Sequence, residues 1–131
     1  MSTAELIDIL FCEDVREEKS GRYSLMGVYP TKEIHVLQLP TIISQFNIVL
    51  RFIGIQADTA DLQVKFTAPD GQDSRPVQAQ KLTSTTPDGE SLFIICIAPI
   101  HLSLEGKHSI LIKVGDDIND ETYFNVIKKN N

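Results

Sequence analysis

The sequence lacks a concentrated cluster of basic residues, and its longest Lys/Arg run is the pair Lys128-Lys129. The chain of 131 residues has a formal net charge of −6 and a sequence isoelectric point near 4.9. Proteins that bind nucleic acids neutralise the phosphates with a concentrated basic face. The composition therefore argues against a nucleic-acid partner.

Long apolar segments are absent as well. No stretch approaches the roughly 20 apolar residues that a membrane-spanning helix needs. Near the N-terminus, the apolar segment 6–12 is short, contains Asp8 and follows an acidic rather than a basic leader, which argues against a signal peptide. We therefore expect a cytoplasmic protein without a membrane partner.

Motifs for catalysis and for cofactor binding are also missing. The sequence contains no G-x-S-x-G motif, no phosphate-cradling glycine loop and no CxxC or Cys/His metal spacing. The three histidines, His35, His101 and His108, are far apart, and we interpret each as a corner or surface residue. We therefore predict no catalytic residue and no cofactor, so that an enzyme ranks third among the functions considered.

Only two cysteines are present, Cys12 and Cys96. In a reducing compartment such residues are free thiols, and both lie in apolar segments. We expect two small buried side chains on neighbouring strands. The negative charges of Glu13 and Asp14 should raise the pKa of the Cys12 thiol rather than activate it as a nucleophile.

The sequence does contain many short apolar or alternating segments, separated by turn signals about every 8–12 residues. This pattern predicts a single domain over residues 1–131 with an all-β fold, an immunoglobulin-like antiparallel β-sandwich of about seven to nine strands. A bulge or a close backbone approach is expected at Gly27, and a short helical turn is allowed at 41–45. The expected strands span 4–12, 22–29, 33–39, 46–56, 62–67, 76–82, 92–100, 107–114 and 121–128.

The stretch 91–114 is the expected core. An apolar run is closed by Pro99, and the chain then turns near Gly106 and returns as an alternating strand, so we predict a core hairpin. Ile110 and Ile112 share the apolar face of the return strand. The series Gly106, His108, Ile110 resembles the corner of immunoglobulin-type sandwiches, with His108 in the place of the usual tyrosine.

A second resemblance lies near the N-terminus. Cys12 is followed by two acidic residues and Val15, and a Gly-Arg-Tyr-Ser-Leu-Met-Gly-Val-Tyr segment then covers 21–29. This combination is similar to an uncharacterised family of small bacterial and phage β-sandwich proteins. The resemblance implies no activity, because none is assigned to that family.

One acidic segment is a candidate metal site. Clustered oxygen ligands at the end of a sandwich can hold calcium, although the spacing is not that of an EF-hand and acidic hairpin loops are commonly just solvated. We favour the solvated loop. The candidate ligands are Asp116, Asp117, Asp120 and Glu121.

The strand 46–56 carries the favoured functional signal. Its inner face holds the alternating apolar residues from Phe46 to Phe52, yet its other face is also largely apolar and must be covered by the chain's own connections, by another protein or by a second copy. We therefore favour a non-catalytic protein-interaction or structural module that can self-associate. A small-ligand or calcium-binding domain that uses the end loops is the alternative. The predicted interaction residues are Val49, Arg51, Ile53 and Ile55.

Overall fold

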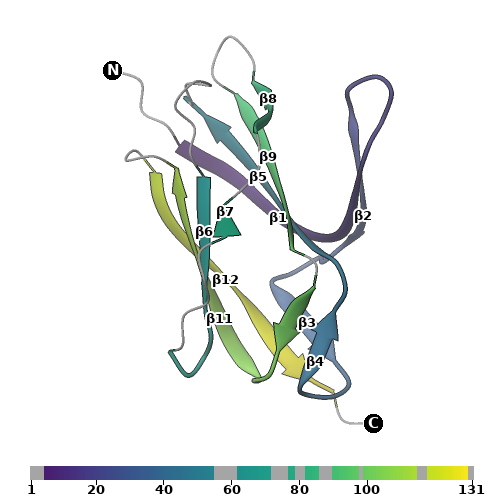
Figure 1. Ribbon diagram of the computed structural model, residues 1–131, viewed down its shortest axis with the longest axis vertical. Coiled ribbons are helices and arrows are strands. Elements are labelled where there is room, and N and C mark those ends of the chain that lie inside the picture. The colour runs from purple at the N-terminus through teal and green to yellow at the C-terminus, as the bar shows by residue number, and fades with distance from the viewer. Residues whose placement is uncertain are drawn as a thin grey trace.

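A computed structural model describes residues 5–54, 62–71, 77–78, 82–85, 90–97, 99–114 and 118–129. These residues form twelve strands and no helix. The strands build two five-stranded sheets and one short two-stranded sheet (Figure 1). The all-β sandwich predicted from the alternating pattern is therefore confirmed.

Sheet A and sheet B are the two layers of the sandwich. Sheet A has the order β2 (Tyr23–Val28), β1 (Glu5–Glu17), β5 (Phe46–Ile53), β9 (Ser91–Ile97) and β8 (Leu82–Thr85). Sheet B has the order β3 (Glu33–Val36), β12 (Ile118–Lys128), β11 (Gly106–Val114), β6 (Leu62–Thr67) and β7 (Val77–Gln78). The two-stranded sheet pairs β10 (Ile100–Leu102) with β4 (Thr41–Ile43).

The hydrophobic core fills the space between sheets A and B. The ring of Phe46 in sheet A lies 5.7 Å, centroid to centroid, from the ring of Phe124 in sheet B, and Phe11 approaches the same ring at 6.3 Å. Each side chain that is fully removed from water contributes about 1.5–3 kcal/mol. The predicted inner faces of β5 and β11 are confirmed, because all of their apolar members are buried: Phe46, Ile48, Leu50, Phe52, Ile110, Ile112 and Val114.

The strand count and several boundaries differ from the prediction. The described residues hold twelve strands instead of about seven to nine, because the chain changes sheets more often than turn signals indicate. The acidic stretch after Cys12 continues β1 as far as Glu17, and the allowed helical turn at 41–45 is the strand β4. One pair, β3 with β12, is parallel rather than antiparallel.

The predicted core hairpin is wrong. β9 belongs to sheet A and β11 to sheet B, and the short strand β10 lies between them in the chain and pairs with β4. Pro99 ends the ladder of β9 as expected, since proline has no N–H to donate. The chain then crosses from one layer to the other instead of folding back.

The corner before β11 uses a histidine. The Nε2 atom of His108 lies 3.0 Å from the backbone carbonyl oxygen of Leu104, and because that oxygen can only accept, the imidazole N–H donates. The same ring stacks on Phe124 at 5.1 Å with an interplanar angle of 4°. His108 thus makes the hydrogen bond to upstream backbone that a tyrosine hydroxyl makes in sandwich corners.

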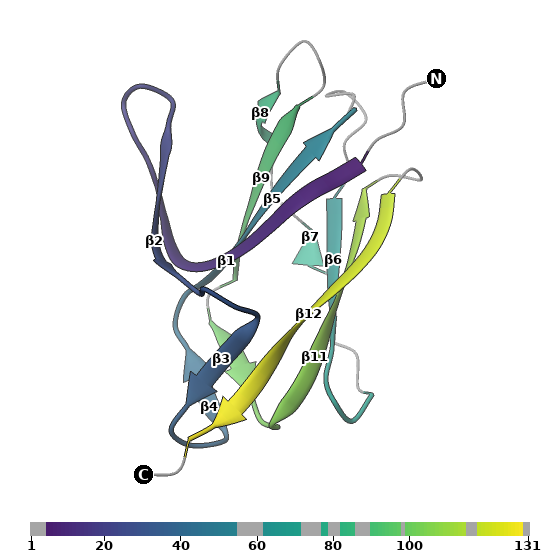
Figure 2. The same cartoon turned by 180° about the vertical axis from the view of Figure 1, so that it is seen from behind.

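The hairpin of β1 and β2 projects beyond the rest of sheet A (Figures 1 and 2). β1 pairs with β5 from Glu5 to Cys12, and with β2 from Cys12 to Glu17. Residues 13–27 therefore form a two-stranded extension, which we call the arm. Its base is irregular at Gly27, whose φ of +66° and contact with Glu13 confirm the close backbone approach predicted there.

Candidate interaction surface

The outer face of sheet A is the side of the sheet turned away from the core. Residues that are directly opposite in neighbouring strands share a face. Val49 on β5 lies opposite Leu10 on β1 and Ile94 on β9, so these three form an apolar row across the sheet. The next row along the strands joins Asp8, Arg51 and Leu92.

Large apolar side chains are exposed beside this row. Leu10 is 38 % exposed, Val28 is 42 % exposed and Met26 is 36 % exposed. Val28 is opposite Cys12 on β1, and Met26 is opposite Asp14, so both lie at the β2 side of the sheet. An exposed apolar area that continues from β1 to β2 is typical of a contact surface.

The predicted interaction residues do not contribute equally. Arg51 is exposed on the outer face, and Ile53 is half-buried at the end of β5. Val49 is only 6 % exposed, so it forms the floor of this face rather than its accessible area. Ile55 lies outside the described residues.

Sequence reasoning missed Leu10, Met26 and Val28. The pairing of β1 with β5 shifts its register between Leu6 and Asp8, so simple alternation from Leu6 gives the wrong face for Leu10. β2 lies at the end of the sheet, where burial does not impose a pattern on the sequence. The cross-strand pairing of the apolar residues Leu10 and Val49 is the signal that would have found Leu10.

The two cysteines occupy one row with Asn47 between them. Cys12 and Cys96 are each opposite Asn47, on either side of β5. Two strand spacings of about 4.8 Å separate the cysteines, more than a disulfide can span. Both thiols are free, and Cys12 is buried as expected. Two parts of the expectation are wrong, because Cys96 is exposed and because β5 separates the strands that carry the two cysteines.

Burial raises the pKa of the Cys12 thiol, and the negative charge of Asp14 adds to this effect. Burial also raises the pKa of Tyr29, with further contributions from Glu13 and Cys12. Both groups are therefore held in their protonated forms, in which neither is a nucleophile. The predicted direction for Cys12 is confirmed, with burial as the larger cause.

The candidate calcium ligands are not assembled by the described part of the chain. Asp120 and Glu121 are exposed residues of β12, and Asp116 and Asp117 lie outside the described residues. Across the described ranges, no three His, Cys, Asp or Glu side chains lie close enough to hold a metal ion. His35 forms an exposed pair with Glu33, at 3.2 Å between Nε2 and Oε1.

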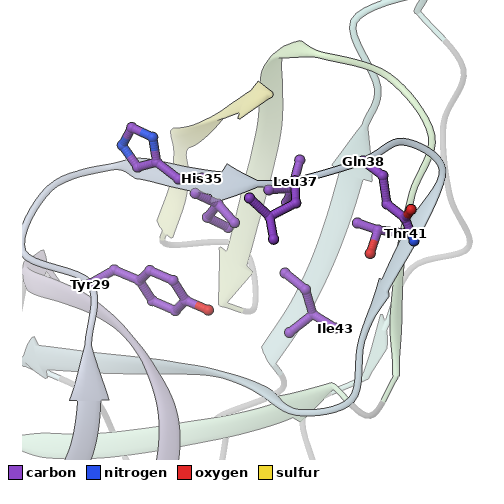
Figure 3. A pocket seen from close by; sticks show the side chains of 8 residues that line it. Tyr29, His35, Leu37, Gln38, Thr41 and Ile43 are labelled. Carbon is purple, nitrogen blue, oxygen red and sulfur yellow. The ribbon is translucent and has the colours of Figure 1, made fainter. Parts of the chain in front are cut away.

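A cavity of about 530 Å³ lies at the opposite end of the sandwich from the β8 end of sheet A, beside β3 and β4. These two strands follow each other in the chain but pair with different partners, β12 and β10. Figure 3 shows Tyr29 and Ile43 pointing into the cavity, while the ring of His35 turns away from it. The lining residues are Tyr29, Ile34, His35, Val36, Leu37, Gln38, Thr41 and Ile43.

Comparisons with known proteins give a family but no activity. In the described part of the chain, no helix is long and apolar enough to cross a membrane. No curated protein matches the sequence. A family model, "Family of unknown function (DUF6941)", matches residues 7–127, nearly the whole chain. The chain therefore belongs to this family, as the resemblance to an uncharacterised family predicted.

Proposed function

We propose that the chain is a non-catalytic protein-interaction module of the cytoplasm, which binds a partner protein through the outer face of sheet A. The observation that carries this proposal is the exposure of Leu10, Met26 and Val28 around the apolar row of Val49. Transfer of apolar surface from water contributes about 25 cal/mol per Å². A partner that covers these side chains gains this free energy, whereas the isolated chain does not.

The composition of the face suits a specific contact. Arg51 and Asp8 lie opposite each other in the row next to the apolar row, and Asp14 lies on the other side of the apolar row, beyond Cys12 on β1. Interfaces typically combine an apolar centre with a polar rim, and arginine is enriched in them. A standard interface covers about 800 Å² on each partner, so the contact must extend beyond the apolar row over the sheet face and the arm.

Two further observations support the proposal. The raised pKa values of Cys12 and Tyr29 favour forms that do not react as nucleophiles, which supports a non-catalytic role. The corner hydrogen bond of His108 supports an immunoglobulin-like sandwich of the kind suggested for bacterial and phage proteins. Such sandwiches commonly use their faces and loops for recognition.

The test is a binding experiment with a single added charge. The full chain is used to capture partners from its native host, and each candidate is then purified and its dissociation constant measured. Leu10→Glu should weaken binding at least 10-fold, because it places a carboxylate in the apolar row. Asn119→Glu adds the same charge at an exposed position of β12 in sheet B and should leave binding unchanged.

Thermal melting decides how a loss of binding is interpreted. Leu10 is partly exposed, so Leu10→Glu should keep a cooperative melt close to that of the wild type. If both variants bind like the wild type, the outer face is not the contact surface. A loss of binding by both variants equally would also contradict the proposal.

The cavity beside β3 favours a second candidate function, the binding of a small ligand. Its volume of about 530 Å³ lies in the range of small-molecule sites, which typically combine apolar walls with a few polar groups. Ile34, Val36 and Ile43 supply the walls. The hydroxyl groups of Tyr29 and Thr41 can hydrogen-bond to a ligand.

Two probes, indole and benzoate, test this second function. Binding should shift the NMR signals of the Ile34 and Ile43 methyl groups in a saturable way. Ile43→Trp should fill the cavity and abolish the shifts, whereas Ile42→Trp alters an exposed neighbour on β4 and should not. Shifts that do not saturate, or that survive Ile43→Trp, would exclude the cavity as the binding site.

A further inference from the structure

Among the strands that the structure describes, no third strand supports the arm. β2 pairs with β1 and is the last strand of sheet A, and the pairing of β1 with β5 ends at Cys12. A two-stranded hairpin is marginally stable in water when nothing packs on it. The ordered extension from Glu13 to Gly27 therefore gains from any strand that pairs with the edge of β2.

The edge of β2 also lacks the protection that charged side chains and proline give. Edge strands are commonly guarded by charged side chains or proline, which prevent pairing with another chain. The segment from Tyr23 to Val28 contains neither a charged residue nor a proline. By contrast, β3 at the edge of sheet B begins with the charged residue Glu33.

We propose that a second copy of this chain pairs its β2 with this β2, antiparallel, about a two-fold axis at Leu25. The two copies then share a continuous ten-stranded sheet, made of two five-stranded sheets A. The contact is isologous and closed, so it gives a dimer rather than a fibre. It uses an edge of sheet A, and it does not depend on the proposed function of the outer face.

The apolar pattern favours an axis at Leu25. Val15 is opposite Leu25 within one chain. Pairing Leu25 with Leu25 of the second copy creates a row of four apolar side chains across the junction, two from each copy. Cross-strand apolar pairs of this kind stabilise a sheet by about 0.2–1 kcal/mol each.

The charges at the ends of the row beside the axis agree with the same register. A two-fold axis perpendicular to the sheet keeps each residue on its own face, so the axis must pass between two identical residues. With the axis at Leu25, Met26 is opposite Ser24 of the second copy, and the row that contains them ends in Asp14 on one side and in Arg16 of the second copy on the other. An axis at Met26 would instead give a row with Asp14 at both ends, and an axis at Ser24 would give one with Arg16 at both ends.

The mass in solution is the first test. Light scattering on the purified full chain should give about twice the monomer mass of 14.6 kDa at high concentration. Leu25→Lys should produce a monomer, because it places two ammonium groups opposite each other on the axis. His35→Lys places a lysine on the exposed edge strand β3 and should remain dimeric.

Cross-linking tests the register without relying on the folding of Leu25→Lys. Directly opposed residues in an antiparallel pair lie within reach of a disulfide. In a Cys96→Ser background, Leu25→Cys should form a covalent dimer on mild oxidation, whereas Ser24→Cys should not. A mixture of Ser24→Cys and Met26→Cys chains should form the mixed dimer.

Each outcome decides the proposal. Dimers that Leu25→Lys abolishes, together with a cross-link at Leu25→Cys, support it. The proposal is overturned if the chain stays monomeric at every concentration up to about 1 mM, which is the dissociation constant of a weak dimer. A dimer that Leu25→Lys does not affect, or a cross-link at Ser24→Cys but not at Leu25→Cys, also overturns it.

Discussion

Asn47 donates a hydrogen bond from Nδ2 to the backbone carbonyl oxygen of Glu13, at 2.8 Å, where β1 separates from β5. The Asn47 side chain is buried on the outer face of sheet A. Ladder pairing between β1 and β5 ends one residue earlier, at Cys12. The Asn47 amide thus takes the place of the β5 backbone N–H that would otherwise pair with the Glu13 carbonyl of β1. This hydrogen bond fixes the base of the arm.

We therefore expect Asn47→Ala to loosen the arm. Removing a buried hydrogen-bond partner costs about 1–3 kcal/mol, because the Glu13 carbonyl then lacks this partner. Urea unfolding should show this loss, and amide hydrogen exchange should accelerate in residues 13–17 and 23–27 more than in β5. Asn125→Ala, on β12, serves as the matched control and should change neither quantity. Unchanged exchange in the arm would show that other contacts hold it.

Gly27→Ala should be more destabilising than Gly21→Ala. Both glycines have positive φ, +66° and +81°, so both substitutions carry a similar backbone cost of about 1–2 kcal/mol. A Cβ at Gly27 would lie 2.8 Å from Cβ of Glu13, whereas a Cβ at Gly21 would have no atom within 4 Å. The difference in unfolding free energy between the two variants therefore measures the contact with Glu13. We expect about 1–3 kcal/mol, the usual cost of overpacking, and equal values would show that the arm relaxes freely.

Ile112→Asp should unfold the domain, whereas Lys113→Asp should not. Ile112 is fully buried in β11, and an unpaired carboxylate there costs several kcal/mol, a large part of the roughly 5–15 kcal/mol that holds a domain together. Lys113 is its exposed neighbour on the same strand. Circular dichroism melts of the two variants provide the measurement. A cooperative melt for Ile112→Asp near the wild-type temperature would mean that the face of β11 is inverted.

The inner faces of the long strands could be predicted from the sequence because burial imposes a period of two on them. β11 and β12 alternate as expected, with Thr122, Phe124 and Val126 on the inner side of β12. The inner face of β5 is buried as predicted, although Asn47 and Val49 on its outer face are buried as well. Ile94 shows where this reasoning stops. It lies in an apolar run that gives no alternation, and only its pairing with Val49 places it on the outer face. We therefore expect Ile94→Asp to lower the unfolding free energy less than Ile112→Asp does.

The arm and the cavity could not be predicted, for two different physical reasons. All of residues 13–17 except Val15 are charged, and charge is usually a sign of a solvated connection, yet a ribbon with two exposed faces tolerates charge on both. The cavity depends on β3 and β4 pairing with distant strands, β12 and β10. Such long-range pairing leaves no local pattern in a short segment.

Alkaline pH should destabilise the fold through Cys12 and Tyr29. Burial raises the pKa of each group in the folded state above its ordinary value. Between the ordinary and the raised pKa, the unfolded chain has lost a proton that the folded chain keeps. The unfolding free energy therefore falls as the pH rises through this interval, and it is unaffected below the ordinary pKa, where both states are protonated.

Urea unfolding between about pH 7 and pH 11, the range that spans ordinary cysteine and tyrosine pKa values, measures this loss. Each group can contribute a slope of up to about 1.4 kcal/mol per pH unit in its own interval. Cys12→Ala should remove the first part of the slope, and Tyr29→Phe should remove a later part. Measurements near pH 7 are the control. Neither group titrates there, so the unfolding free energies of the wild type and both variants should depend on pH with the same slope. If both variants keep the wild-type slope at alkaline pH, other groups cause the loss of stability and the burial of Cys12 and Tyr29 has no energetic consequence.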